Sequence, residues 1–208
     1  MKLYFSQGAC SLSPHIVLRE AGLPFELVRV HLGNKKTSTG EDFYTINPKG
    51  YVPTLQLDDG QILTEGPAIV QYIADLAPQS NLAPPAGTFA RVRLQEWLNY
   101  ISTEIHKSFS PLFSPKAPAD WKQVMRDYLA SRLDFVAPVL ASQPFLMGDH
   151  FTAADAYLYT TLRWCRLVEF DLAKWPSLQA YLQRVSERPS VKAAMSAERP
   201  LPASHAQS

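Results

Sequence analysis

The 208-residue sequence predicts a two-part protein, with an α/β N-terminal part followed by an all-α C-terminal part. Strand-like and helix-like segments alternate over about the first 80 residues, which favours helices packed against a mixed sheet. Three prolines and a glycine then cluster between Pro78 and Thr88, a composition typical of a linker. Beyond this cluster the segments are long and amphipathic, and strand signals are scarce.

The N-terminal part is expected to have the element order βαβαββα and a mixed four-stranded sheet. Apolar and charged residues alternate in the second strand, and Asp58-Asp59-Gly60 predicts a hairpin turn between the last two. Glu65-Gly66-Pro67 opens a helix with proline in its first turn. Residues 33–40 are predicted to be a polar loop. The four strands are predicted at residues 2–6, 25–30, 51–57 and 61–64, and the first helix at 11–20.

The C-terminal part is expected to be helical throughout. Its amphipathic segments are residues 89–113, 121–140, a third from Thr152, 175–187 and 191–197. Thr152 and Asp155 form a Thr-x-x-Asp pattern before an apolar run, which predicts a capping box. We therefore divide the chain into an α/β domain at 1–80, a linker at 81–87, an all-α domain at 88–200 and a flexible tail at 201–208.

Composition excludes several classes of function. The chain is 46% hydrophobic and 19% charged, with a formal net charge of +1, so bulk charge attracts neither nucleic acid nor an anionic membrane. No apolar stretch is long enough to span a bilayer, and the N-terminus resembles a strand rather than a signal peptide. Two cysteines make no disulfide framework, and no metal-binding motif appears. We expect a cytoplasmic protein without a metal.

Cys10 lies where the first predicted strand meets the first predicted helix. Free backbone N–H groups and the positive end of the helix dipole favour a thiolate at such a junction. A buried, inert cysteine is the alternative, and the residues around Cys10 alone do not decide between the two. Cys165, in an apolar helical segment, is expected to be buried and inert.

Six short segments in one order resemble bacterial beta-class glutathione S-transferases, over roughly residues 1–198. They are Gly8–Ser11, Asn47–Pro53, Leu63–Gly66, Trp97–Tyr100, Glu104–Lys107 and Phe151–Asp155. The resemblance implies a thioredoxin-like N-terminal domain that binds glutathione as co-substrate, an all-helical domain with an electrophile site, and a homodimer. It also implies a cis peptide bond before Pro53, and a stabilising role for Thr152 and Asp155.

The resemblance assigns roles to individual residues. Cys10 and His106 would be catalytic, beside the glutathione sulfur. The backbone of Val52 would pair with the cysteinyl unit of glutathione. The glutathione-binding set that it implies is Cys10, Lys35, Val52, Glu65, Gly66, Asn99, Thr103, Glu104 and His106, with Thr103 and Glu104 acting in part across the dimer interface.

Structural explanations remain open for several of these residues. Glu65 suits the helix dipole even without a ligand, and a loop lysine such as Lys35 is ordinarily solvated. A lone helix histidine such as His106 is usually structural. The proposed cleft walls Phe109, Phe113, Trp164 and Leu167 are equally well explained by core packing.

Three functions follow as hypotheses. The first is conjugation of glutathione to small aromatic, halogenated or other electrophiles, as in detoxification. The second uses Cys10 as a nucleophile in a glutathione-dependent thiol-disulfide oxidoreductase, peroxidase or dehalogenase. The third is a non-catalytic ligand-binding module.

Overall fold

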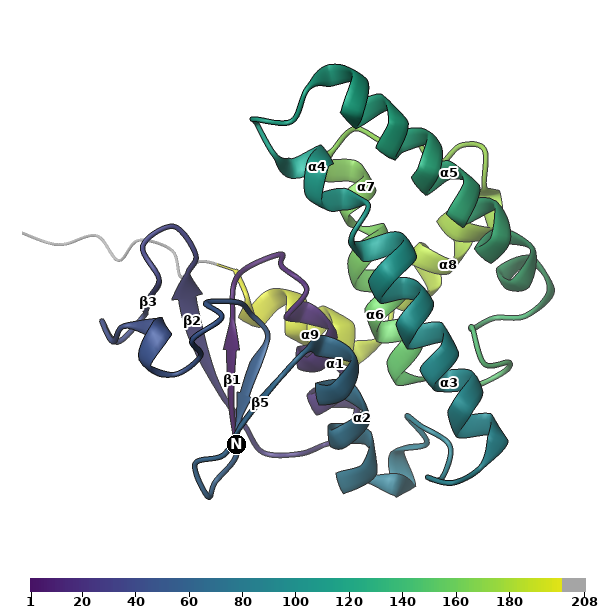
Figure 1. The fold of residues 1–208 in the computed structure, drawn as a ribbon. Helices are drawn as coiled ribbons and strands as arrows, with labels where there is room; N and C mark the ends of the chain where they lie inside the picture. Colours follow the sequence, from purple (N-terminus) through teal and green to yellow (C-terminus); the bar gives the residue numbers. More distant parts are fainter. Residues whose placement is uncertain (200–208) are drawn as a thin grey trace, which may run out of the picture.

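The computed structural model describes residues 1–199, so the predicted tail at 201–208 lies outside the described residues. Figure 1 shows a sheet with helices beside it in one half and a bundle of helices in the other. The strands are β1 (Lys2–Phe5), β2 (Glu26–His31), β3 (Lys36–Thr37), β4 (Thr54–Gln56) and β5 (Ile62–Thr64). The helices are α1 (Leu12–Glu20), α2 (Gly66–Leu76), α3 (Phe89–Tyr100), α4 (Phe109–Phe113), α5 (Ala119–Ser142), α6 (Ala153–Leu162), α7 (Trp164–Leu167), α8 (Pro176–Ser186) and α9 (Pro189–Ala197).

The sheet is mixed, with strand order β3-β2-β1-β4-β5. Strand β1 runs parallel to β2 and antiparallel to β4, and β4 pairs with β5 as a hairpin. Side chains alternate between the two faces of the sheet. Leu3 joins the core that contains α1 and α2, whereas Tyr4 packs with Phe43 in a smaller cluster on the other face. The mixed sheet and the helical second half agree with the sequence-based prediction.

Two details of the predicted α/β part are wrong. The sheet has five strands rather than four, because residues within the predicted polar loop form β3, where Thr37 is buried and pairs with Val30. The predicted helix between the second and third strands is a single 3-10 turn, η1 (Phe43–Thr45). Only Phe43 of this turn is buried, so one turn is enough to cover the sheet face.

The predicted helix over residues 89–113 is also interrupted. Helix α3 ends at Tyr100, a π-helical turn η3 (Ile101–His106) follows, and α4 begins at Phe109. In η3 the Lys107 N–H donates to the carbonyl of Ser102, five residues earlier. Such single π turns occur frequently at functional sites.

The two halves share one apolar core. A continuous cluster of buried residues runs from Leu3 in β1 to Ala194 in α9. Helix α6 is buried along its whole length and packs against α1, α2 and α3, and α9 packs on α1. Helix α9 therefore returns the end of the described chain to the α/β half (Figure 1).

The N-terminus of α6 carries the capping box. The Asp155 carboxylate accepts from the backbone N–H and the hydroxyl of Thr152, both at 2.9 Å. Its second oxygen accepts from the Leu146 N–H at 2.9 Å and from the Tyr181 hydroxyl at 3.3 Å. Despite these donors, complete burial raises the pKa of Asp155 to about 6.

Among residues 1–199, no helix has both the length and the apolar character needed to cross a bilayer.

Candidate active site

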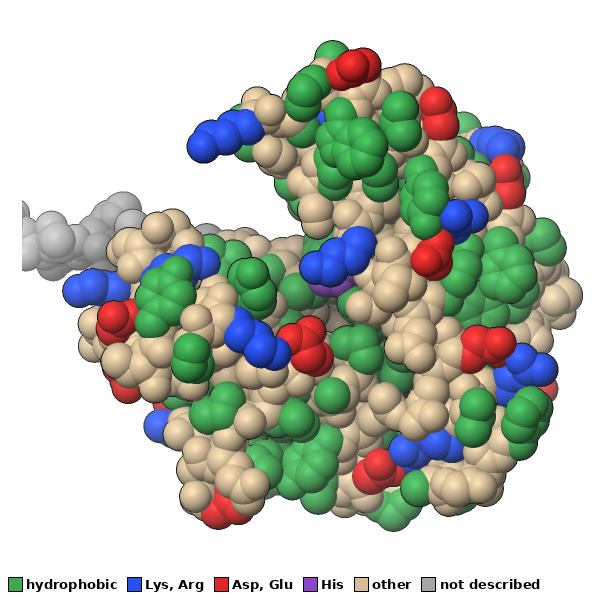
Figure 2. Space-filling model, in the orientation of Figure 1, with side chains coloured by type: hydrophobic (Ala, Val, Ile, Leu, Met, Phe, Trp, Pro, Cys, Tyr) green, Lys and Arg blue, Asp and Glu red, His purple; other side chains and the backbone are tan. Residues whose placement is uncertain are grey.

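A pocket of about 300 Å³ opens between the loops at one end of the sheet and the helical half. Figure 2 shows it as part of a notch between the two lobes, with a basic side chain and a histidine at its floor. Predicted site residues from both halves meet in this pocket. They are Cys10, Lys35, Val52, Pro53, Glu65, Gly66 and His106.

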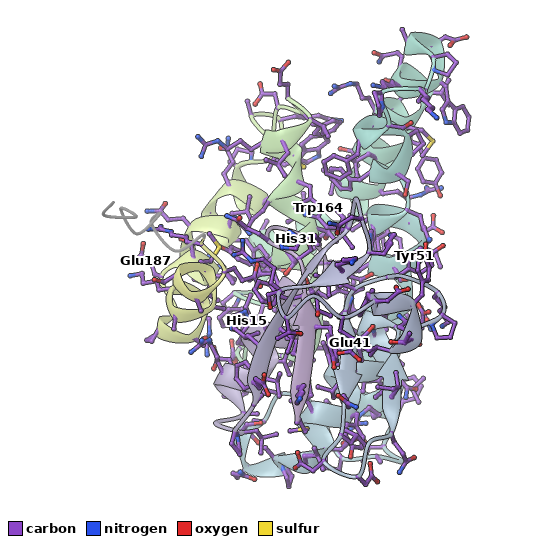
Figure 3. All side chains as sticks on the ribbon, turned by 90° about the vertical axis from the view of Figure 1, so that its left-hand side faces the viewer. His15, His31, Glu41, Tyr51, Trp164 and Glu187 are labelled. Atoms are coloured by element: carbon purple, nitrogen blue, oxygen red, sulfur yellow. The ribbon has the colours of Figure 1, made fainter. Side chains whose placement is uncertain are left out.

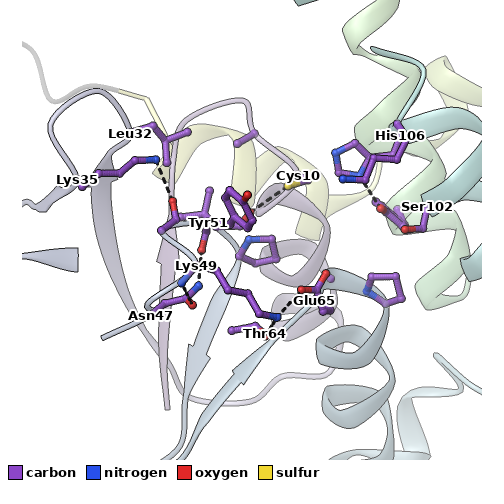
Figure 4. Close-up of a pocket in the computed structure, with 18 residues that line it drawn as sticks. Cys10, Leu32, Lys35, Asn47, Lys49, Tyr51, Thr64, Glu65, Ser102 and His106 are labelled. Carbon is purple, nitrogen blue, oxygen red and sulfur yellow. Dashed lines mark hydrogen bonds and ion pairs between the residues drawn. The ribbon is translucent and has the colours of Figure 1, made fainter. Parts of the chain in front are cut away.

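Cys10 precedes α1 and donates its S–H to the Val52 carbonyl, with sulfur and oxygen 3.2 Å apart (Figure 4). Burial raises the pKa of the Cys10 thiol to about 11, and this outweighs hydrogen bonds from the backbone N–H groups of Cys10 and Ser11 that lower it. Of the two alternatives that the sequence left open for Cys10, this pKa favours the buried, neutral thiol. Desolvation of the charged form exceeds the stabilisation from N–H groups and helix dipole.

The turn before Cys10 is fixed by residues far along the chain. The Gly8 carbonyl accepts from the Trp164 indole N–H at 2.8 Å, and the Gly8 N–H donates to Glu198 Oε2 at 3.3 Å. Glu198 Oε1 lies 3.0 Å from Nδ1 of the fully buried His15. Figure 3 shows Trp164 near the upper end of the sheet and His15 in the interior below it. Trp164 in α7 and Glu198 at the end of α9 thus position the turn before Cys10.

The loop from Asn47 to Pro53 forms a second wall. Its Val52–Pro53 peptide bond is cis, as the resemblance implies. The buried Asn47 amide donates to the Tyr51 carbonyl and to Thr54 Oγ1, both at 2.9 Å. Gly50 has φ of 66°, and a Cβ there would lie 2.7 Å from the ring of Tyr44. Glycine is therefore favoured at this position, because any other residue would be strained at this φ and would displace the Tyr44 ring.

Charged side chains surround the same loop. Lys35 donates to the Gly50 carbonyl at 3.0 Å, and Lys49 forms an ion pair with Glu65 at 2.7 Å. Glu65 itself has φ of 68°, a conformation that non-glycine residues adopt rarely. Gly66 follows as the first residue of α2, so its N–H lies at the positive end of that helix.

His106 reaches the pocket from the π turn. Its Nδ1 is 2.6 Å from the hydroxyl of Tyr157 on α6. Burial lowers the pKa of His106 to about 4 and raises the pKa of Tyr157 well above its usual value, so both are neutral at pH 7. Either the imidazole or the phenol can be the donor in this hydrogen bond, and when the Tyr157 O–H donates to Nδ1 the histidine proton resides on Nε2. A neutral imidazole in this tautomer is a hydrogen-bond donor.

Three predicted residues lie outside this pocket. Asn99 and Thr103 are exposed, and the Thr103 hydroxyl donates to the Asn99 carbonyl at 3.1 Å. The Glu104 carboxylate accepts from the Tyr128 hydroxyl and lies 2.8 Å from Arg132 Nε. None of the three lines the pocket beside Cys10.

Sequence reasoning missed other lining residues, among them Lys49, Ser102, Lys107 and Tyr157. Lys49 lies within the Asn47–Pro53 segment, but only the fold reveals that its side chain pairs with Glu65. Tyr157 is 51 positions from its partner His106, a separation that no local pattern bridges.

An apolar pocket of about 300 Å³ adjoins the first one and shares Cys10 and His106 with it. Phe109, Phe113 and Trp164 line it with rings 5.5 to 6.1 Å apart, and Leu167 completes the wall. The four predicted cleft residues therefore share one cavity, although Phe109 is also fully buried in the core.

Comparisons with known proteins point to one family. The model of the glutathione S-transferase N-terminal domain matches residues 8–76, and that of the C-terminal domain matches residues 100–189. The chain is 48% identical over 198 residues to glutathione S-transferase GstA of Escherichia coli O157:H7, covering 95% of this chain and 98% of that protein.

Solved structures of glutathione S-transferases are also similar to this chain. A ternary complex of BphK, a bacterial glutathione S-transferase, is 57% identical with a TM-score of 0.94, covering 95% of this chain and 99% of that one. A sphingomonad glutathione S-transferase complexed with glutathione is 46% identical with a TM-score of 0.92, covering 95% and 98% respectively.

Proposed function

The chain belongs to the glutathione S-transferase family of enzymes, and from this premise we propose that it conjugates glutathione to small electrophiles in the pocket beside Cys10. The observation that carries the proposal is the meeting of Cys10, the Val52 backbone, Glu65 and His106 in one cavity between the two halves. The adjoining aromatic cavity supplies an apolar place for the electrophile. The proposed substrates are aryl or alkyl halides and similar carbon electrophiles.

Glutathione would lie along the loop that ends at Val52, with its cysteinyl unit pairing to the Val52 backbone. Glu65 would accept the γ-glutamyl ammonium, and the Gly66 N–H would face the carboxylate of the same group. Lys35, now held by the Gly50 carbonyl, would turn to the glycyl carboxylate.

The sulfur of glutathione would then lie between Cys10 and His106. When the cysteinyl N–H of glutathione takes the Val52 carbonyl, the Cys10 S–H loses its acceptor and is free to donate to the glutathione thiolate. The His106 Nε2–H is a second donor of this kind, and such donors lower the pKa of the bound thiol. The thiolate attacks the electrophilic carbon, a C–S bond forms, and halide leaves with the bonding electron pair.

An assay of conjugation to 1-chloro-2,4-dinitrobenzene tests this function, together with direct titration of glutathione binding. We expect saturable conjugation by the wild-type protein and by Cys10→Ala, with a lower rate in the variant. Glutathione binding without any conjugation would reject the proposal in favour of disulfide chemistry, and no binding would favour a carrier module.

Tyr157→Phe is expected to lower kcat/KM for conjugation about tenfold, the effect of losing one hydrogen bond at a reacting group. Without the Tyr157 hydroxyl, nothing holds the His106 proton on Nε2. The pH profile of kcat/KM should therefore shift its rising limb to higher pH. Tyr159→Phe is the matched control, because Tyr159 is buried in the same helix but does not line the pocket. Equal effects of both substitutions would contradict this role.

We also propose that the protein is a homodimer in the cytoplasm. Trp97, Tyr100 and Phe135 form a cluster of aromatic rings on α3 and α5, and Phe135 is 57% exposed. Large exposed apolar patches mark association sites. Two free cysteines in the described chain suit a reducing compartment.

Sedimentation velocity should give a dimer for the wild-type protein and a monomer for Phe135→Glu. Asn99, Thr103 and Glu104 flank this aromatic cluster, so the dimer is the form in which they would approach a partner's glutathione. Val124→Glu, at another exposed apolar position on α5, is the control and should remain dimeric. A wild-type monomer would overturn the proposal.

A further inference from the structure

The imidazole of His106 has a hydrogen-bonding partner on the side away from the incoming sulfur. Its Nδ1 is 2.6 Å from the hydroxyl of Tyr157, and either group can be the donor. The ring also packs edge-on against Trp164, but the indole N–H of Trp164 is already engaged with the Gly8 carbonyl. In the part of the chain that the structure describes, the hydrogen bond of the His106 ring therefore runs to Tyr157.

Ser102 extends this contact toward solvent. It lies one turn before His106 in η3, and both side chains line the pocket together with Tyr157 (Figure 4). A hydrogen bond from the Ser102 side chain to Tyr157 partly offsets the effect of burial on the Tyr157 pKa. Tyr157 is only 3% exposed, whereas Ser102 is partly exposed. Two hydroxyl groups thus connect the imidazole to water.

His106 cannot keep the proton of a bound thiol in addition to its own. Burial and the nearby Lys107 ammonium lower the pKa of His106 to about 4, so an imidazolium is disfavoured at pH 7. A proton that enters at Nε2 must therefore be matched by one that leaves from Nδ1, where Tyr157 is the partner.

Other groups in the pocket are poor acceptors for this proton. Burial raises the pKa of the Cys10 thiol to about 11, so Cys10 already carries its proton at pH 7. The carboxylate of Glu65 is paired with Lys49 at 2.7 Å. Bound glutathione also places its sulfur against Nε2, which closes the direct path from that nitrogen to water.

We propose that Tyr157 and Ser102 form a proton relay that carries the thiol proton of bound glutathione from His106 to water, and this inference rests on the proposed function. Before transfer, His106 Nδ1–H donates to the Tyr157 oxygen, Tyr157 donates to Ser102, and Ser102 donates to water. The thiol proton then moves to Nε2 and the Nδ1 proton moves to Tyr157. The Tyr157 proton moves to Ser102, and the Ser102 proton moves to water.

The protons and charges of this step balance. The S–H bond breaks, the sulfur keeps the electron pair as a thiolate, and water gains one proton. Each group of the relay loses one proton and gains one, so none changes its net charge and nothing is oxidised or reduced. Afterwards Ser102 donates to Tyr157, Tyr157 donates to Nδ1, and the Nε2–H of His106 faces the thiolate. The relay therefore leaves His106 in the tautomer that stabilises the thiolate.

Rapid mixing of the protein with glutathione, in the absence of an electrophile, tests the relay. Thiolate formation is followed by ultraviolet absorbance, and proton release by a pH indicator in weak buffer. The proteins are wild type, Ser102→Ala, Ser102→Thr, Tyr157→Phe, the double variant Ser102→Ala/Tyr157→Phe and the control Ser142→Ala. Ser142 is exposed at the end of α5, and its hydroxyl donates to the Val139 carbonyl of the same helix. Calorimetric titration measures the glutathione affinity of each protein.

Ser102→Ala should slow thiolate formation and proton release about tenfold, with glutathione affinity unchanged, because a relay alters rates and not equilibria. Added imidazole buffer should restore the rate of Ser102→Ala, since a small base replaces the lost hydroxyl, and should not accelerate the wild type. Ser102→Thr keeps the hydroxyl and should react like the wild type, as should Ser142→Ala.

The double variant tests whether the two hydroxyls act in one chain. It should be no slower than Tyr157→Phe alone, because either substitution interrupts the same route. Rate losses that multiply in the double variant would overturn the proposal, since the two residues would then act independently.

Two further results would overturn the relay and leave the proposed function standing. One is an unchanged rate in Ser102→Ala, and the other is a slow rate that imidazole does not restore, since Ser102 would then act through packing alone. If the wild-type protein bound no glutathione, or bound it without forming a thiolate, the proposed function would fail, and this inference with it.

Discussion

Cys10 in the glutathione-free protein should react with iodoacetamide at pH 7 roughly a hundredfold more slowly than an unperturbed cysteine, because only the thiolate is nucleophilic. Burial raises the pKa of Cys10 from 9.0 to about 11, and its S–H is engaged with the Val52 carbonyl. The thiolate fraction, and with it the rate, should rise about tenfold for each pH unit between 7 and 10.

Mass spectrometry of the alkylated protein measures this rate. Cys10→Ala is the control, because Cys165 is buried, with its pKa raised to about 12 by burial, and should remain unmodified. A rate that is already constant below pH 8 would contradict the prediction, since it would mean that the helix start stabilises the thiolate after all.

The reactivity of Cys10 bears on the choice between conjugation and disulfide chemistry. A neutral thiol is a hydrogen-bond donor and a poor nucleophile, which suits an auxiliary role beside the glutathione sulfur. A thiol-disulfide oxidoreductase needs the opposite, a thiolate near neutral pH. The raised pKa of Cys10 therefore favours conjugation, and a fast reaction of Cys10 at pH 7 would favour the alternative.

Asp155→Ala should lower the free energy of unfolding by about 3–5 kcal/mol, a large share of the stability of a typical domain. The substitution leaves the Leu146 N–H and both donors of Thr152 buried without an acceptor. Urea denaturation measures the loss. Asp149→Ala is the matched control, because Asp149 is exposed and should change stability by less than about 0.5 kcal/mol.

The effect of Asp155→Ala should depend on pH in a defined direction. Burial raises the pKa of Asp155 from 3.8 to about 6, so the folded state binds the proton more tightly than the unfolded state does. The contribution of this group is fully present below pH 3.8 and is lost as the pH rises through 6. The difference between wild type and variant should therefore be about 1 kcal/mol larger at pH 5 than at pH 7. A difference that grows toward pH 7 would refute the direction of this shift.

Local sequence signals predicted the parts of the fold that depend on neighbouring residues. Examples are the Asp58-Asp59-Gly60 hairpin, the start of α2 at Gly66 and the capping box of α6. In each of them, the residues that determine the structure are only a few positions apart in the sequence. The π turn and the two-residue strand β3 were not predicted, because packing against other elements decides them. Amphipathic periodicity over 89–113 cannot reveal one additional residue per turn.

The site likewise has features that the local sequence predicts and features that only the folded structure reveals. Cys10, Val52, Glu65 and His106 belong to motifs that a resemblance can transfer residue by residue. Their electrostatic state depends on burial and on distant partners, so the raised pKa of Cys10 and the hydrogen bond between His106 and Tyr157 were not predictable. Lys49 needed the folded turn to show that it faces Glu65.

The contacts of Gly8 have a consequence for synthesis of the chain. The Cys10 turn leaves the ribosome early, yet the Glu198 carboxylate that holds the Gly8 N–H lies 190 positions later. At bacterial and eukaryotic translation rates of about 5–20 residues per second, roughly 10–40 seconds separate the two. Throughout that interval the turn before Cys10 lacks its Glu198 contact, although Val52 and later Trp164 are already available to hold it.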